Sequence, residues 1–136
     1  MKLDLTSFEK ALAALDRGLA RAASAPDDEE LRDACIQRFE FTFELAWKML
    51  KRRLELDLPN AAEVDAMSYR TLIRTGAEQG LIDDVSAWFV YRDKRNLTSH
   101  TYNADKAAAV YAVLPAFTQH ARQLLERLRA RGAQDA

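Results

Sequence analysis

The stretch RFEFTFELAWKMLK, residues 38–51, carries apolar side chains on two sides of a helical wheel drawn at about 100° per residue. One side, extended by neighbouring positions, holds Ile36, Phe39, Phe43, Trp47, Leu50 and Leu54. The other side holds Phe41, Leu45 and Met49. A helix that is apolar on two sides must be covered on two sides, so this segment is expected at the centre of a helical bundle. The sequence leaves open whether the second side packs within the bundle or against a second copy of the chain.

The helix around this stretch is expected to be long. Asp27 or Asp28 can cap its start, because a carboxylate accepts hydrogen bonds from the free amides of the first turn and suits the positive end of the helix dipole. The helix should continue to about Leu56, and Pro59 stops it. At about 1.5 Å per residue it would be roughly 40 Å long, which makes it the spine of the domain.

Apolar residues recur at helical spacing in four other segments. The first segment follows a Thr6/Ser7 cap and spans about residues 7–21, and an ASAPDD linker ends it. After a polar loop, Ser68 caps a short helix that closes at Gly80, a residue suited to the left-handed conformation at a helix end.

Two more helices are expected in the second half of the chain. Asp83 and Asp84 open one of them, and the other runs from Asn103 to about Leu128, with a kink or short break at Pro115. Together the segments predict an all-α fold, an antiparallel up-and-down bundle of four to five helices.

Composition supports this fold class. The chain has 136 residues, of which 49% are hydrophobic and 30% charged, and it contains only 4 glycines and 3 prolines. This balance favours a helical protein over a β-sandwich or a disordered chain. The length suits one domain over residues 1–136, with the RGAQDA tail, residues 131–136, expected to fray.

Charge and cysteine content limit the possible partners and location. The formal net charge is −1, so contact with RNA would need a local basic patch, for which Arg92 and Lys94 are the candidates. Cys35 is the single cysteine, which excludes an internal disulfide and a multi-thiolate zinc site and fits a reducing cytoplasm. We expect no cofactor, no metal site from only two histidines, and no membrane or export segment.

The polar stretch RDKRNLTSHTYN, residues 92–103, concentrates the candidate chemistry. Arg95 and His100 would point about 140° apart on an unbroken helix, so they can act together only if the helix breaks between them. Thr98, Ser99, Thr101 and Asn103 favour caps and turns, which predicts a break between about residues 97 and 103. If the helix instead persisted, Asn96 could hold the imidazole four residues later.

An arginine beside a histidine suits the cleavage of RNA. His100 can take a proton from the 2′-hydroxyl at neutral pH, while the Arg95 guanidinium stabilises charge on the phosphate, so a cyclic phosphate forms without a metal ion. One histidine cannot readily act as base and acid in one step, so we expect a symmetric dimer with two His100 side chains at one cleft. The alternative is a solvated charge run in which Asp93 neutralises its neighbours.

The motif R-x4-H-x-Y in RNLTSHTY, together with RFEFTFELAWKMLK, resembles the HEPN superfamily of helical bundles. More narrowly, the chain resembles the branch of nucleotidyltransferase substrate-binding proteins, which are partners of minimal nucleotidyltransferases in toxin–antitoxin pairs. The similarity in organisation extends from the first helix to about Leu128.

This resemblance implies a dimeric, metal-independent ribonuclease toxin with Arg95 and His100 as catalytic residues and Asn96 as the polar residue after the arginine. It also implies that a minimal nucleotidyltransferase attaches AMP to Tyr102, which adds phosphate charge and bulk where RNA would bind. Two alternatives stay open. One is a non-catalytic helper subunit of the nucleotidyltransferase that dimerises through the second helix, and the other is a helical adaptor in which RNLTSHTYN is a capped turn.

Other polar and aromatic residues are expected to be structural. His120 should pack at the edge of the core. Glu40 and Glu44 should form a salt-bridged stripe with nearby lysines, although Glu44 could orient Arg95 if the stripe faces the cleft. The aromatic residues at helical spacing should belong to the core, and Tyr102 alone among the tyrosines should be exposed; the expected core residues are Trp47, Trp88, Tyr91 and Tyr111.

Overall fold

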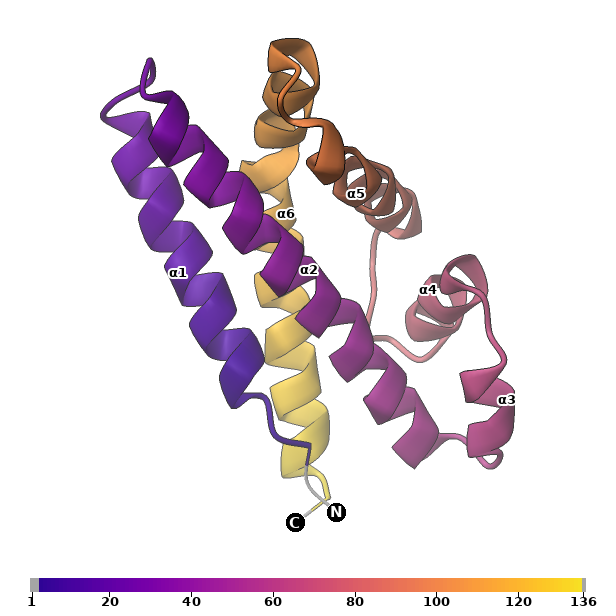
Figure 1. Cartoon of the computed structure of the whole chain (residues 1–136). Coiled ribbons are helices and arrows are strands. Elements are labelled where there is room, and N and C mark those ends of the chain that lie inside the picture. Colours follow the sequence, from indigo (N-terminus) through magenta and orange to yellow (C-terminus); the bar gives the residue numbers. More distant parts are fainter. Residues whose placement is uncertain (1–2, 136) are drawn as a thin grey trace.

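The computed structural model describes residues 3–135, and all regular secondary structure in this part of the chain is helical, as predicted (Figure 1). Its elements are α1 (Thr6–Ala23), α2 (Glu29–Asp57), α3 (Ala61–Asp65), α4 (Tyr69–Glu78), α5 (Val85–Leu97), the 3₁₀ turn η1 (Thr98–His100) and α6 (Ala104–Ala133). No helix among these residues combines the length and hydrophobicity needed to cross a bilayer.

Helix α2 is the spine of the fold and contacts every other element. In Figure 1, α1 lies along α2 on one side, α6 runs behind the pair, and α3, α4 and α5 lie on the other side of α2. The long α1, α2 and α6 therefore form a three-helix group, and the shorter helices pack on the other side of α2.

Four of the predicted helix caps are present, but the Thr6/Ser7 cap of the first helix is not, because α1 begins at Thr6 and its N-cap, Leu5, has no side-chain hydrogen bond. Asp28 accepts hydrogen bonds from the amides of Glu30 and Leu31 at 3.0 and 3.1 Å. Ser68, Asp84 and Asn103 cap α4, α5 and α6 in the same way. Each side chain satisfies an amide that has no partner inside its own helix. Gly80, which follows α4, has the positive φ of 79° that its position required.

The structure differs from expectation at two places along the backbone. The segment expected to be a polar loop contains α3, a single helical turn. Asn60 caps its start, because its side chain accepts a hydrogen bond from the backbone amide of Ala62 at 3.0 Å. Pro115 does not break α6, which continues to Ala133. Proline lacks the amide that would donate to the Tyr111 carbonyl, and α6 tolerates the loss of this one bond.

The expectation of a frayed tail is wrong for the residues that the structure describes; Ala136 lies outside them. Arg53, only 3% exposed, forms ion pairs with Asp57 and with Asp135 at the end of the chain. Burial raises the pKa of the Asp57 carboxyl, but hydrogen bonds from Arg53 and Arg131 outweigh burial and leave that pKa below its usual value. A buried guanidinium needs such partners, and they fasten the end of α6 to α2.

The centre of the core is a group of aromatic rings around Phe117 of α6. This ring contacts Phe39 and Phe43 of α2 at centroid distances of 4.9 and 6.3 Å. It also contacts Trp88 and Tyr91 of α5 at 6.0 and 5.2 Å. Several of these pairs meet edge to face, a favourable arrangement of ring quadrupoles. Phe117 therefore holds α2, α5 and α6 together.

The second apolar side of α2 is only partly covered. Met49 is buried and Leu45 half-buried, but Phe41 is 59% exposed. The bundle thus covers the C-terminal part of this side and leaves the N-terminal part open.

Replacement of Phe117 by alanine should destabilise the fold by about 3–5 kcal/mol, because a fully buried ring is lost from the contact of three helices. Denaturant unfolding followed by circular dichroism measures this loss. Leu56→Ala is the control, since Leu56 is 43% exposed and its truncation should change the free energy of unfolding by less than about 0.5 kcal/mol. Equal effects of the two substitutions would contradict the central role of Phe117.

Candidate nuclease site

The predicted break between Arg95 and His100 is present. Helix α5 ends at Leu97, the 3₁₀ turn covers Thr98–His100, and α6 begins at Ala104. The Thr98 hydroxyl donates to the Arg95 carbonyl at 2.7 Å, and the Asn103 amide donates to the His100 carbonyl at 3.1 Å. The Thr98 side chain thus bonds to a carbonyl at the end of α5, and a backbone bond closes the turn before α6.

Arg95 is held by Glu44 of α2. The Arg95 Nε donates to Glu44 Oε1 at 3.2 Å, and the indole nitrogen of Trp47 donates to the other oxygen at 3.2 Å. About a third of each side chain in the Arg95–Glu44 pair is exposed, so the pair contributes little to stability, about 0–1 kcal/mol. Its main effect is to orient the guanidinium, which leaves further N–H groups available to a ligand.

The predicted stripe of salt bridges between Glu40, Glu44 and nearby lysines on α2 is only partly present. Glu44 does lie near Lys48, at 3.9 Å. Lys51 instead pairs with Asp65 at the end of α3, at 3.6 Å, and Glu40 forms no ion pair within residues 3–135.

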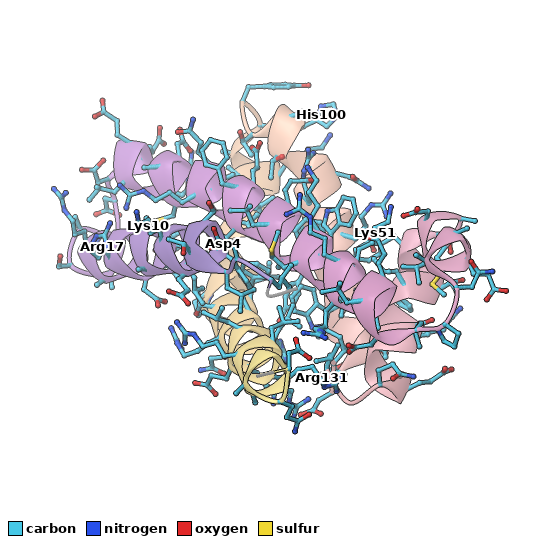
Figure 2. The ribbon with its side chains drawn as sticks, turned by 90° about the horizontal axis from the view of Figure 1, so that it is seen from below. Asp4, Lys10, Arg17, Lys51, His100 and Arg131 are labelled. Carbon is cyan, nitrogen blue, oxygen red and sulfur yellow. The ribbon has the colours of Figure 1, made fainter. Side chains whose placement is uncertain are left out.

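His100 and Tyr102 lie together on the exposed turn after α5. Both side chains are exposed, Tyr102 by 85%, and their ring centroids are 6.1 Å apart at an interplanar angle of 68°. Figure 2 shows His100 at one edge of the molecule, where its ring reaches solvent. Asn96 makes no hydrogen bond to His100 in the described structure, since the helix ends before the geometry for that contact can form.

A cavity of about 400 Å³ lies between α2, α4 and α5, next to Arg95. Its volume is within the range of small-ligand sites. The lining residues are Phe43, Glu44, Trp47, Lys51, Met67, Tyr69, Leu72, Arg92, Arg95 and Asn96. Trp47, expected in the core, is half-buried: it packs against the core and also lines this cavity, whereas Trp88 is buried as expected.

The basic residues of the stretch are not neutralised by Asp93. The Arg92 guanidinium lies 4.8 Å from the centroid of the Tyr69 ring and has no carboxylate partner in residues 3–135. The half-buried Lys94 likewise forms no ion pair there. The alternative in which Asp93 neutralises its basic neighbours on α5 is therefore not what the structure shows.

His120 packs at the edge of the core, as predicted. Its Nδ1 is 2.5 Å from the Tyr91 hydroxyl. Burial, with a smaller contribution from the charge of Asp84, raises the pKa of Tyr91 to about 12. Among residues 3–135, no three His, Cys, Asp or Glu side chains are grouped as a metal site would require.

Comparison with known proteins assigns the family. The sequence model of the family described as nucleotidyltransferase substrate binding protein like matches residues 3–130, nearly the whole chain. The chain belongs to this family. The family match, the fold and the relatives place it in the nucleotidyltransferase substrate-binding branch of the HEPN superfamily, as its motifs indicated.

A curated relative of this family is the probable ribonuclease HepT of Haemophilus influenzae. It is 46% identical over 100 residues, which are 74% of this chain and 68% of the relative.

Two solved structures share the fold. A Haemophilus influenzae structure, described as revealing the fold of a substrate-binding domain of a nucleotidyltransferase, matches with a TM-score of 0.88 and 36% identity over 93% of this chain and 99% of that one. A structure from Thermus thermophilus matches with a TM-score of 0.76 and 38% identity, over 90% and 98% of the two chains.

The fold gathers the candidate residues of this family member into two adjacent groups. Arg92, Arg95 and Asn96 line the cavity, and His100 and Tyr102 form the exposed turn beyond it. The sequence interpretation did not find the cavity itself, because its lining comes from separate segments: Trp47 and Lys51 lie on α2 and Tyr69 on α4. The one local signal was the spacing of Glu44 and Trp47, which are three residues apart on the same helix.

The exposure of Tyr102 predicts selective chemical modification. Mild nitration with tetranitromethane should modify Tyr102 first, because Tyr91 is only 3% exposed and burial raises the pKa values of Tyr69 and Tyr91. Peptide mass spectrometry measures the order of modification. The Tyr102→Phe variant is the control and should lose the fast phase, whereas equal rates at Tyr91 would contradict the described geometry.

Proposed function

We propose that this chain is a metal-independent RNA endonuclease, the toxin of a toxin–antitoxin pair, and that a partner nucleotidyltransferase silences it by attaching AMP to Tyr102. The observation that carries the proposal is the pairing of Arg95 with Glu44 beside an open cavity, one short turn before the exposed His100. The name of the Haemophilus influenzae relative, probable ribonuclease HepT, supports the same reaction class.

The cleavage step uses the 2′-hydroxyl of RNA as its nucleophile. His100 removes the proton from this hydroxyl, and the bond from O2′ to phosphorus forms as the bond from phosphorus to O5′ breaks. The products are a 2′,3′-cyclic phosphate and a 5′-hydroxyl end. Arg95 donates to the non-bridging oxygens, on which negative charge increases in the transition state. Glu44 keeps the guanidinium in place, so little reorganisation is needed during the reaction.

The leaving O5′ needs a proton, and one imidazole cannot supply it while it holds the proton from O2′. We therefore propose that two copies of the chain bring their His100 side chains to one cleft. Phe41, 59% exposed on the second apolar side of α2, would lose solvent exposure in such a contact.

The proposed silencing step acts next to the same imidazole. The Tyr102 oxygen attacks the α-phosphorus of ATP, pyrophosphate leaves, and the phenol proton is lost to a base. The new phosphodiester carries negative charge and a nucleoside close to His100, since the two rings are 6.1 Å apart. An RNA phosphate is then repelled and excluded from this turn.

The cleavage proposal predicts that the wild-type protein cuts a structured RNA in excess EDTA and leaves cyclic phosphate ends. His100→Ala should lower the rate by at least about 100-fold, which is typical for the loss of a general acid or base. Arg95→Lys should also be impaired, because lysine keeps the charge but lacks the planar fork of donors. Gel electrophoresis of end-labelled RNA measures the rates.

The control for this test is His120→Gln, which alters the other histidine of the chain, away from the turn, and should cut within about threefold of wild type. A dimeric, AMP-free wild-type protein that does not cut RNA would refute the nuclease. That result would favour the alternative of a non-catalytic helper subunit of a nucleotidyltransferase. The cavity and the description of the Haemophilus influenzae structure as a substrate-binding domain are the observations that support this alternative.

The silencing proposal predicts that the cognate nucleotidyltransferase transfers label from ATP radiolabelled at its α-phosphate to the wild type and that the modified protein no longer cuts RNA. Tyr102→Phe should take no label and should keep cutting in the presence of the enzyme and ATP. Tyr111→Phe is the matched control, because Tyr111 is half-buried on α6 and should leave labelling unchanged. Labelling of the Tyr102→Phe variant would place the modification elsewhere.

A further inference from the structure

The cavity beside Arg95 contains groups that the cleavage step does not need. Besides the core residue Phe43, two aromatic rings line it from different helices, Trp47 from α2 and Tyr69 from α4. Three cations, Lys51, Arg92 and Arg95, line it as well, against the single carboxylate of Glu44. A site that combines aromatic rings with excess positive charge suits a ligand with both a flat ring system and negative charge.

The two rings are held in place by hydrogen bonds at their polar ends. The Trp47 indole nitrogen donates to Glu44 at 3.2 Å, and the Tyr69 hydroxyl donates to the Trp88 carbonyl at 2.9 Å. Burial raises the pKa of Tyr69, so this hydroxyl stays a donor at neutral pH. Rings that are already fixed lose little conformational freedom when a planar ligand stacks on them.

Arg92 is the cavity cation that is available to an anion, whereas Lys51 pairs with Asp65 and Arg95 with Glu44. Arg92 has no carboxylate partner in residues 3–135, and its guanidinium lies over the Tyr69 ring at 4.8 Å. The Asn96 side chain makes no hydrogen bond in the same part of the chain, so its amide can both donate and accept.

Positive charge continues from the cavity along the outer side of α4 and α5. A second hollow of about 460 Å³ adjoins the cavity and shares Tyr69, Arg92 and Asn96 with it. Arg70, Phe89 and one carboxylate residue, Asp93, also line this hollow. Arg70 and Arg74 lie over the Phe89 ring at 4.5 and 5.4 Å and form no ion pair within residues 3–135. A mononucleotide would contact only the residues of the cavity. An RNA strand carries a phosphate at every nucleotide, so it can also contact the arginines of the second hollow.

We propose that the cavity is a nucleotide subsite that takes one base of a single-stranded RNA between Trp47 and Tyr69, with a flanking phosphate on Arg92 and Arg95. The inference rests on the proposed nuclease function, because it uses the same strand that His100 cuts. It names a substrate class for the site, RNA with an unpaired nucleotide. The strand continues over the second hollow toward Arg70 and Arg74.

Binding is tested without cleavage in the His100→Ala variant, with tryptophan fluorescence as the readout. A short single-stranded RNA should quench the emission of Trp47, whereas Trp88 is 2% exposed and should not respond. The same titration with AMP and with inorganic phosphate separates a strand from a free nucleotide and from an anion. RNA should bind at least about tenfold more tightly than AMP, because only the strand reaches the further arginines.

Three substitutions in the His100→Ala background assign the residues, with binding measured by anisotropy of a labelled RNA. Trp47→Phe should bind RNA but lose the quenching, and Trp47→Ala should bind at least about fivefold more weakly. Arg92→Gln should weaken binding and lower the slope of log affinity against log salt by about one. Arg17→Gln on α1 is the control and should bind unchanged, since Figure 2 shows Arg17 far from Lys51 and His100.

RNA binding that is unaffected by both Trp47→Ala and Arg92→Gln would overturn the subsite, and so would equal affinity for AMP and RNA. Circular dichroism of each variant establishes that it is folded, and Trp47→Phe retains an aromatic ring in case Trp47→Ala does not fold. The two proposals fail separately. A wild-type protein that cuts RNA without Trp47 quenching refutes only the subsite, and one that shows the quenching but never cuts refutes only the nuclease.

Discussion

The packing of Phe117 between two other helices is the contact on which the arrangement of the site depends. Its ring touches Phe39 and Phe43 of α2 on one side and Trp88 and Tyr91 of α5 on the other. Interiors packed this densely do not deform continuously, so the three helices keep one relative position. Glu44 follows Phe43 on α2 and Arg95 lies one turn after Tyr91 on α5, and the aromatic core thereby sets the geometry of their ion pair.

The site is built on a rigid scaffold but lies where the scaffold ends. Arg95 is in the last turn of α5, oriented by Glu44, while His100 and Tyr102 lie on the exposed turn that follows. This division suits the proposed roles. A group that stabilises charge must be fixed before the reaction, whereas the imidazole and the phenol must be reached by RNA and by another protein.

Charge in this protein is organised locally. The net charge is −1, and many arginines are neutralised in ion pairs, such as those of Arg53 with Asp57 and Asp135. Three arginines on α4 and α5 are different, because Arg70, Arg74 and Arg92 lie over aromatic rings and form no ion pair within residues 3–135. Such cations keep their charge available for phosphate, so a nearly neutral chain can still present a basic surface.

Local patterns in the sequence determined the helices, their caps and the break after α5, because these depend on residues within about four positions of one another. Asp28, Ser68, Asp84 and Asn103 cap where their types predicted, and the motif residues Arg95, His100 and Tyr102 identified the family. Only the tertiary structure decided that Trp47 lines a cavity, that Glu44 holds Arg95 and that Asp135 pairs with Arg53. Each of these facts joins side chains from distant segments, and contacts of that kind follow from how helices pack, which no spacing within one helix specifies.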